Sequence, residues 1–162
     1  MLGLFTHAQT FDVAEKTPVI QDGIEYGYQI RSEQIKEAGG EEYSRFEISF
    51  YITNKSGCHR YFALPAGSYT NYNHQLLASF NISNANGKRL TSKNAQIRAR
   101  EFYTPVKLKE RIDGKDKERT ETVHVGYIFR DAETLRDQVI VLVPKGERPQ
   151  VTCTANHPPV LQ

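Results

Sequence analysis

The amino-acid sequence predicts an all-β protein, because runs of alternating apolar and polar residues recur along the chain and almost no stretch has the spacing of a helix. The alternation is clearest in four runs: Ile24, Tyr26, Tyr28 and Ile30; Phe46, Ile48, Phe50 and Ile52; Leu76, Ala78, Phe80 and Ile82; and Val123, Val125, Tyr127 and Phe129. A period of two places one face of each strand in a core and the other face in water. Turns that contain glycine separate the runs, which indicates antiparallel hairpins.

The first half of the chain predicts extended segments at residues 11–20, 24–35, 43–53 and 59–64. Pro18 lies in the first of them and favours an edge strand or an extended arm, because proline has no amide hydrogen to donate to a ladder. The residues from Glu37 to Gly40 supply the positive-φ positions of a hairpin between the second and third segments.

The second half predicts extended segments at residues 75–83, 88–92, 102–112, 119–130, 139–143 and 150–154. Asn86-Gly87 and Asp113-Gly114 are hairpin-turn sequences, because both residues of such a pair tolerate positive φ. Between Lys93 and Arg100 the alternation fades, and a single helical turn is expected there. The segment from Val139 to Val143 is apolar on both faces, which is typical of a central strand covered from two sides.

About eight or nine strands at this spacing predict an antiparallel β-sandwich of immunoglobulin-like or jelly-roll architecture, with a closed barrel as the alternative. The chain has no tryptophan, so the immunoglobulin signature itself is missing. With 162 residues it has the length of one domain. We expect one core, lined by Phe46, Ile48, Phe50, Phe80, Ile82, Val125, Tyr127, Val141 and Val143.

The first eight residues resemble the end of a secretory signal. Met1 to Phe5 is short and apolar, and small residues stand at Thr6 and Ala8, where a signal peptidase would inspect the chain before Gln9. A frayed terminus is the alternative. The sequence therefore predicts a secreted or periplasmic protein whose single β-sandwich domain covers residues 9–162, and it contains no apolar run long enough to span a membrane.

The charge pattern argues against nucleic acid as a partner. The chain has 21 Lys and Arg residues against 19 Asp and Glu residues. The densest charged stretch, from Lys107 to Arg119, mixes both signs, so its long-range field largely cancels.

Two cysteines leave three alternatives open. A disulfide between Cys58 and Cys153 would suit an oxidising compartment, whereas two unpaired buried thiols would suit any compartment. Together with His59 and His157 they could supply four zinc ligands. Neighbours in a strand point to opposite faces, however, so Cys58 and His59 are poorly placed to share a metal, and we expect no metal and no cofactor.

No motif in the sequence marks a catalytic centre, and no catalytic residue is predicted. Ser56, Ser68 and Ser83 lie in turn-rich contexts where hydroxyls bond to nearby backbone. A glycine loop that cradles phosphate and an acidic metal-binding loop are both missing.

The loop from Ser68 to His74 is the predicted recognition site. Its candidate ligand-binding residues are Tyr69, Asn71, Tyr72, Asn73 and His74. Tyrosine offers a large amphipathic contact area and asparagine adaptable hydrogen bonds, the chemistry of binding loops. The alternative is that both tyrosine rings cap the end of the core.

These observations predict a non-catalytic binding or surface-assembly module that recognises a protein or a glycan through loops or an edge strand. Two alternatives remain open. One is a small hydrolase whose site forms only in three dimensions, and the other is a structural subunit that completes a sheet with a partner chain.

Overall fold

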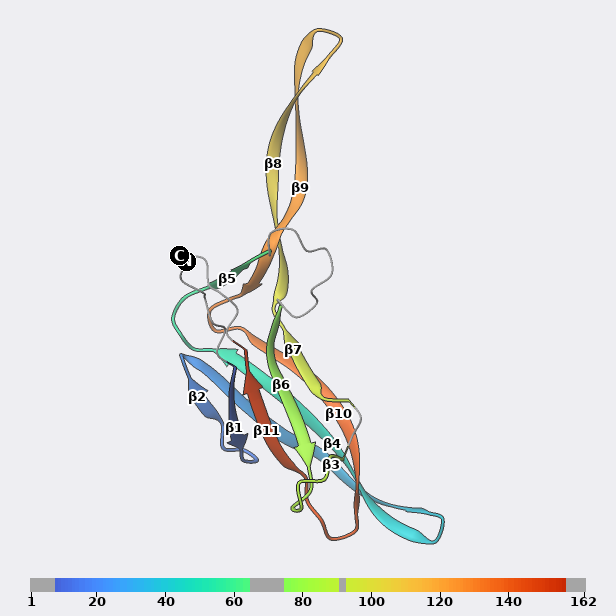
Figure 1. The fold of residues 1–162 in the computed structure, drawn as a ribbon. Coiled ribbons are helices and arrows are strands. Elements are labelled where there is room, and N and C mark those ends of the chain that lie inside the picture. Colours follow the sequence, from blue (N-terminus) through green and yellow to red (C-terminus); the bar gives the residue numbers. More distant parts are fainter. Residues whose placement is uncertain (1–7, 65–74, 91–92, 157–162) are drawn as a thin grey trace.

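The computed structural model describes residues 8–64, 75–90 and 93–156, and in these residues it contains strands and no helix (Figure 1). The strands are β1 (Gln9–Val13), β2 (Val19–Gln21), β3 (Ile24–Ala38), β4 (Glu41–Asn54), β5 (Arg60–Ala63), β6 (Leu76–Ser83), β7 (Ala95–Arg98), β8 (Arg100–Ile112), β9 (Lys115–Phe129), β10 (Thr134–Pro144) and β11 (Gln150–Ala155). The all-β prediction is confirmed.

The strands form three antiparallel sheets. One has the order β1-β11-β6-β7, the second has the order β10-β4-β3-β2, and the third has the order β5-β9-β8. Buried residues of the first two sheets share one hydrophobic core, as expected of a β-sandwich. The third sheet leaves this body, and the β8–β9 hairpin projects from it as a long twisted arm (Figure 1).

The rings of Phe50 on β4 and Phe80 on β6 meet across the two layers, with their centroids 4.9 Å apart. Most of the residues expected to line the core are indeed buried: Phe46, Ile48, Phe50, Phe80, Ile82, Val141 and Val143. The alternation of these segments therefore identified the correct face of β4, β6 and β10.

The prediction is wrong for Val125 and incomplete for Tyr127. Val125 is 37% exposed, and Tyr127 is partly buried at the edge of the core. The register shifts between Phe102 and Tyr103, so Val125 is an extra residue in the ladder, and β9 leaves the sandwich at this level. Val123, one step further along the arm, is 38% exposed.

Of two predictions about the middle of the chain, one is met in part and one is wrong. The chain returns beside β6 at residues 88–90, where Arg89 bridges Ser83 and the amide of Leu90 donates to the carbonyl of Ile82 at 3.0 Å, but these residues form no strand, and residues 91–92 lie outside the described part. The helical turn expected from Lys93 to Arg100 is replaced by β7, which pairs with β6. Pairing with a neighbouring strand outweighs the weak local preference of this segment.

β10 is an edge strand, not the central strand that its apolar sequence predicts. It pairs with β4 on one side and is the last strand of its sheet. Its outward side chains Ile140 and Leu142 are 52% and 55% exposed. A run that is apolar on both faces here has one face in the core and the other in solvent.

Gly126 joins the arm to the body through a close backbone approach. β5 pairs with β9, and their backbones approach so closely that a Cβ atom at residue 126 would lie 2.2 Å from the carbonyl oxygen of Phe62. Only glycine fits there, because it has no side chain. Beyond this point β5 ends, and β8 and β9 continue as a ribbon of two strands.

Candidate functional site

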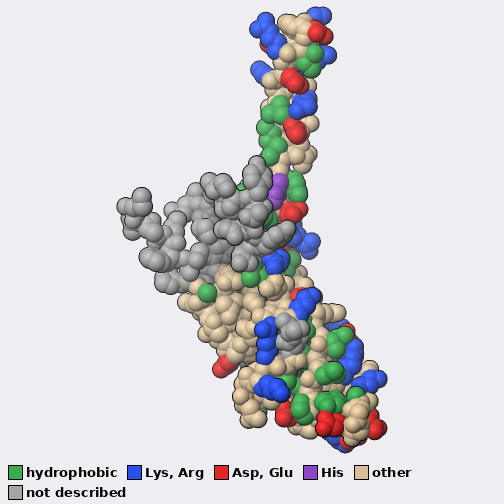
Figure 2. Space-filling model, turned by 45° about the vertical axis from the view of Figure 1, so that its right-hand side comes forward, with side chains coloured by type: hydrophobic (Ala, Val, Ile, Leu, Met, Phe, Trp, Pro, Cys, Tyr) green, Lys and Arg blue, Asp and Glu red, His purple; other side chains and the backbone are tan. Residues whose placement is uncertain are grey.

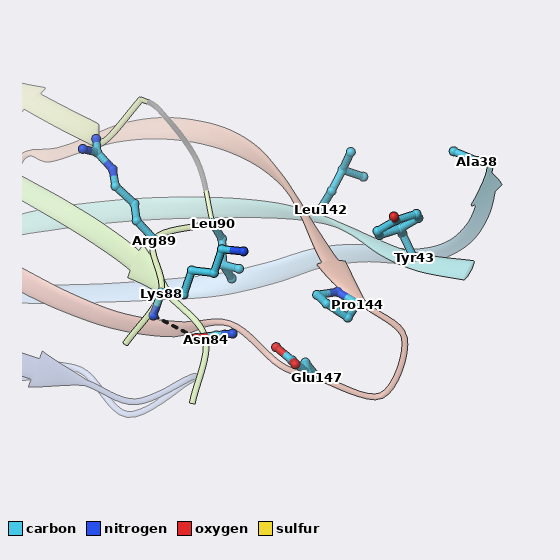
Figure 3. A pocket seen from close by; sticks show the side chains of 9 residues that line it. All are labelled: Ala38, Tyr43, Asn84, Lys88, Arg89, Leu90, Leu142, Pro144 and Glu147. Atoms are coloured by element: carbon cyan, nitrogen blue, oxygen red, sulfur yellow. Dashed lines mark hydrogen bonds between the residues drawn. The ribbon is translucent and has the colours of Figure 1, made fainter. Parts of the chain in front are cut away.

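A groove of about 600 Å³ lies where the C-terminal end of β10 faces the turn that follows β6 (Figure 3). In Figure 3 the residues of this turn lie on one side, and the ends of β3, β4 and β10 lie on the other. The volume is in the range of natural binding pockets.

Asn84 fixes the shape of the turn. Its side chain is buried, and its Oδ1 accepts hydrogen bonds from the backbone amides of Asn86 at 3.1 Å and Lys88 at 2.9 Å. The backbone of Asn84 also donates to the carbonyl of Lys88 at 2.9 Å. An asparagine that bonds its own turn in this way closes the reversal after β6, from which the amide of Leu90 returns to donate to the carbonyl of Ile82 at 3.0 Å.

The wall of the groove is largely apolar. Leu142 and Pro144 come from β10, Leu90 comes from the turn, and Tyr43 comes from the start of β4. Leu142 is opposite Arg45 in the ladder and Pro144 is opposite Tyr43, so the apolar patch continues from β10 onto β4. These side chains lie at a sheet edge, where a further chain could cover them.

Glu147 is the acidic group of the groove. Its backbone amide donates to the carbonyl of Pro144 at 3.1 Å, which holds it in the turn after β10. Its Oε2 is buried and has no hydrogen-bond partner among the described residues. A buried carboxylate oxygen is costly without a donor, so this atom marks the place where a ligand's N–H or ammonium group would bind.

Lys88 and Arg89 complete the polar lining. The Nη2 of Arg89 donates to the Oδ1 of Asn94 at 2.6 Å, so this guanidinium is held by the body of the protein. The described lining contains no histidine, serine or cysteine. Its polar side chains are those of Tyr43, Asn84, Lys88, Arg89 and Glu147.

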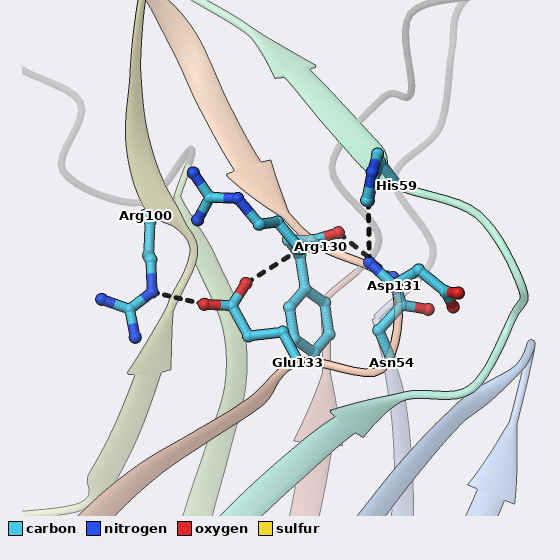
Figure 4. A network of polar contacts seen from close by, with 7 residues as sticks. Asn54, His59, Arg100, Arg130, Asp131 and Glu133 are labelled. Carbon is cyan, nitrogen blue, oxygen red and sulfur yellow. Dashed lines mark hydrogen bonds and ion pairs between the residues drawn. The ribbon is translucent and has the colours of Figure 1, made fainter.

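A second polar centre anchors the arm to the sandwich (Figure 4). Asn54 is fully buried, and its Nδ2 donates to the carbonyls of Cys58 at 2.9 Å and Phe129 at 3.1 Å. Its Oδ1 accepts from the backbone and the hydroxyl of Ser56, at 3.1 Å and 2.6 Å. One side chain thus ties the ends of β4 and β9 and the chain before β5 together.

Glu133 supports the same junction from the turn between β9 and β10. One carboxylate oxygen pairs with the Nε of Arg100, and the other accepts from the amide of Arg130 at 2.9 Å. His59 Nδ1 accepts from the amide of Asp131 at 2.9 Å. Glu133 and His59 thus bond to residues of the protein itself, and these bonds fix the root of the arm.

The arm beyond this root has two unlike faces. Residues directly opposite each other in an antiparallel pair project to the same face, and here Val106 is opposite Glu121, Leu108 is opposite Arg119 and Ile112 is opposite Lys115. We call the face that carries Val106, Leu108, Ile112 and Lys115, together with Glu110, Lys117, Arg119 and Glu121, the apolar–basic face.

The opposite face is polar from Lys107 to the tip, and each of the two faces carries three basic and two acidic residues. There Lys109 is opposite Glu118 and Arg111 is opposite Asp116. The Nζ of Lys109 lies 4.0 Å from Glu118 Oε1. Among the described residues Lys115 has no ion pair, because its cross-strand neighbour is the apolar Ile112.

The predicted recognition loop, with Tyr69, Asn71, Tyr72, Asn73 and His74, lies outside the described residues. His157, one of the considered zinc ligands, also lies outside them. Within residues 8–64, 75–90 and 93–156, no group of three or more His, Cys, Asp or Glu side chains could hold a metal ion.

Both cysteines are free in the structure, Cys58 exposed and Cys153 buried. The expectation that both are buried is therefore wrong for Cys58, which follows the turn after β4 and points away from the core. Burial raises the pKa of the Cys153 thiol to about 12.

Sequence reasoning found the turn at residues 84–87 but missed the groove. Glu147 lies in a turn that the sequence marks only by its glycine and proline neighbours, and Leu142 was attributed to a covered strand. Apolar residues alternate with charged ones along β8, but only the ladder register shows which residues of β9 share their face.

Comparison with protein-family models, with curated proteins and with solved structures found no match to this chain. No helix long and apolar enough to cross a membrane occurs in the described part of the chain.

Proposed function

We propose that this protein is a non-catalytic assembly module that binds a partner protein through the apolar–basic face of the β8–β9 arm. The observation that carries the proposal is the arm itself, a free ribbon with an apolar stripe on one face. The proposal includes a secreted or periplasmic location, which rests on the apolar residues before Thr6 and the small residues that follow.

The physical argument concerns the stability of an isolated ribbon. Two strands without a third strand or a covering layer are at best marginally stable in water. Beyond Gly126 the described residues add neither. Ile112 is 41% exposed and Val123 is 38% exposed. Neither side chain belongs to the core, so polar residues at these positions would not weaken it. A partner that covers this face would remove the apolar side chains from water and stabilise the ribbon.

The charges define the chemistry of the partner. Lys115 adds an unpaired cation next to Ile112 on the same face. A complementary surface therefore combines apolar side chains with a carboxylate.

The structural-subunit alternative has support of its own from β10. This strand has eleven residues and a free edge, and its outward residues Ile140 and Leu142 are exposed. A free edge of this kind is a template for an added strand. The hydrolase alternative has no comparable support, because the described lining of the groove contains no histidine, serine or cysteine.

A photo-crosslinking amino acid at position 108 of the full chain, produced in the organism that encodes it, tests the proposal. Position 107 is the matched control, because it is the next residue of β8 and projects to the opposite face. We expect one defined protein adduct from position 108 and little from position 107. Purified wild-type protein should then bind that partner, and the Leu108→Asp variant should not.

The arm does not support the core, so Leu108→Asp should retain the melting temperature of the wild type. Equal adducts from both positions, or a partner that binds the variant as well as the wild type, would show that the apolar–basic face is not the binding surface.

A further inference from the structure

We propose that the groove beside β10 receives the tip of the β8–β9 arm of a second copy, so that the protein associates head to tail. This inference rests on the proposed function, since it names a second copy as the partner that the arm binds. It also gives an occupant to the groove, where Oε2 of Glu147 has no donor among the described residues.

The positions of the two surfaces require the partner to be another copy. The arm projects from one end of the molecule, and the groove lies at the other end, beside the tip of the β3–β4 hairpin (Figure 1). An arm therefore cannot reach the groove of its own chain. A contact between two unlike surfaces of identical chains is heterologous, and it continues until a ring closes or a filament forms.

The apolar parts of the two surfaces match. Ile112 lies at the arm tip, 41% exposed, next to the Asp113-Gly114 turn. Leu90, Leu142 and Pro144 line the groove, and Leu142 is 55% exposed. Seating Ile112 between these side chains removes apolar surface from water on both copies.

The polar parts match as well. Lys115 lies directly opposite Ile112 on the same face and has no ion pair among the described residues. Glu147 Oε2 is buried in the groove without a donor. An ammonium group that enters with Ile112 would donate to this oxygen, and such a charge-assisted bond is stronger than a neutral one.

Charges of both signs occur at both ends of the molecule, so the contact depends on the residues that meet and not on the net charge of either end. From Lys107 to Arg119 the arm carries six basic and four acidic residues, and beside the groove Glu42 pairs with Lys145 while Arg148 lies 3.9 Å from Glu33. Figure 2 shows blue and red side chains together at the arm tip and at the lower end of the body.

Sedimentation velocity over protein concentrations up to about 1 mM tests the inference, since a contact of one arm tip is small and therefore weak. The Cys58→Ser background with reductant excludes disulfide-linked dimers through the exposed thiol. We expect concentration-dependent association of the parent protein. It should weaken at least about tenfold in Ile112→Asp and in Leu142→Asp, and it should weaken with added salt.

Leu142 and Ile112 are exposed, so both variants should fold, and circular dichroism verifies this. Lys107→Glu is the control for charge on the arm, because it changes the opposite face and should leave association unchanged. Lys115→Glu should weaken association, and Lys115→Glu with Glu147→Lys in one chain should restore it, because the reversed charges meet between copies.

A mixing experiment establishes the direction. Ile112→Asp has an intact groove and Glu147→Lys has an intact arm, so each should be monomeric alone and a mixture should form heterodimers that grow no further. A parent protein that stays monomeric would overturn the inference but leave the crosslinking test of the arm unaffected. Association that survives in all single variants, or a mixture that stays monomeric, would also overturn it.

Discussion

At the scale of single residues, burial divides side chains that look alike in the sequence. Phe80 on β6 and Leu142 on β10 are both apolar residues of alternating runs, yet Phe80 is fully buried and Leu142 is 55% exposed. The cost of removing a side chain follows the area it hides from water, and not its hydrophobicity alone.

Phe80→Ala should destabilise the protein by about 3–5 kcal/mol, because it opens a cavity where the rings of Phe50 and Phe80 meet between the sheets. Leu142→Ala is the matched control and should cost less than about 0.5 kcal/mol, as expected of an exposed position. Urea unfolding measures both values. Equal losses in the two variants would contradict the assignment of the core.

The two thiols should differ in reactivity and in their effect on stability. Cys58 should react with a thiol reagent in the native protein, whereas Cys153 should react only after unfolding. The free thiol ionises near pH 9.0, and burial raises the pKa of Cys153 to about 12.

Between these values the unfolded chain binds fewer protons than the folded chain, so the free energy of unfolding falls as the pH rises from about 9 to about 12. The contribution of this thiol is fully present below pH 9. Cys153→Ala should flatten the decline, which unfolding curves at several pH values measure. A slope unchanged by the substitution would show that the thiol is not buried as described.

At the scale of elements, side-chain hydrogen bonds replace ladders where strands end. Asn84 shapes the turn at the groove, and Asn54 ties three chain segments together at the root of the arm. Both asparagines occupy turn sequences, where their side chains form hydrogen bonds with backbone groups that are not paired with another strand.

Asn54→Ala should cost about 2–4 kcal/mol, because it removes a fully buried side chain that bonds the buried carbonyl of Phe129 and the part-buried amide of Ser56. Ser56→Ala removes one hydroxyl of the same network and should cost less than about 1 kcal/mol. Chemical unfolding compares the two. A cost for Asn54→Ala no larger than that for Ser56→Ala would show that the network does not hold the junction.

At the scale of the whole molecule, the sandwich and the arm are energetically separate. The core lies between the two four-stranded sheets, and the arm beyond Tyr103 and His124 contributes no residue to it. Stability should therefore reside in the body, and binding in the arm.

Replacing residues 104–123 with Asn-Gly joins Tyr103 to His124, which are opposite each other in the ladder. The shortened protein should melt within about 3 °C of the parent, because the deleted ribbon buries little apolar surface. Hydrogen exchange provides the second measurement, with amides of residues 104–122 in the parent exchanging far faster than those of β4 and β6. A large drop in melting temperature would show that the arm supports the fold.

The sequence by itself determined most of the strands and turns and most of the core, but not β7. Alternation and turn chemistry are local properties, so Asp113-Gly114, Asn86-Gly87 and the inward faces of β4 and β6 could be located without a structure. The turn of the arm hairpin was predicted for the same reason, although β9 begins at Lys115 and not at Arg119 as expected.

Only the tertiary structure decided what covers each strand. Val125 alternates like Phe50 but lies on a ribbon that leaves the body, and Val139 to Val143 is apolar like a central strand but lies at a sheet edge. The groove with Leu142 and Glu147 follows from this edge position. Neighbours in a sheet are far apart in sequence, so the exposure of a strand's faces depends on long-range packing that local patterns do not contain.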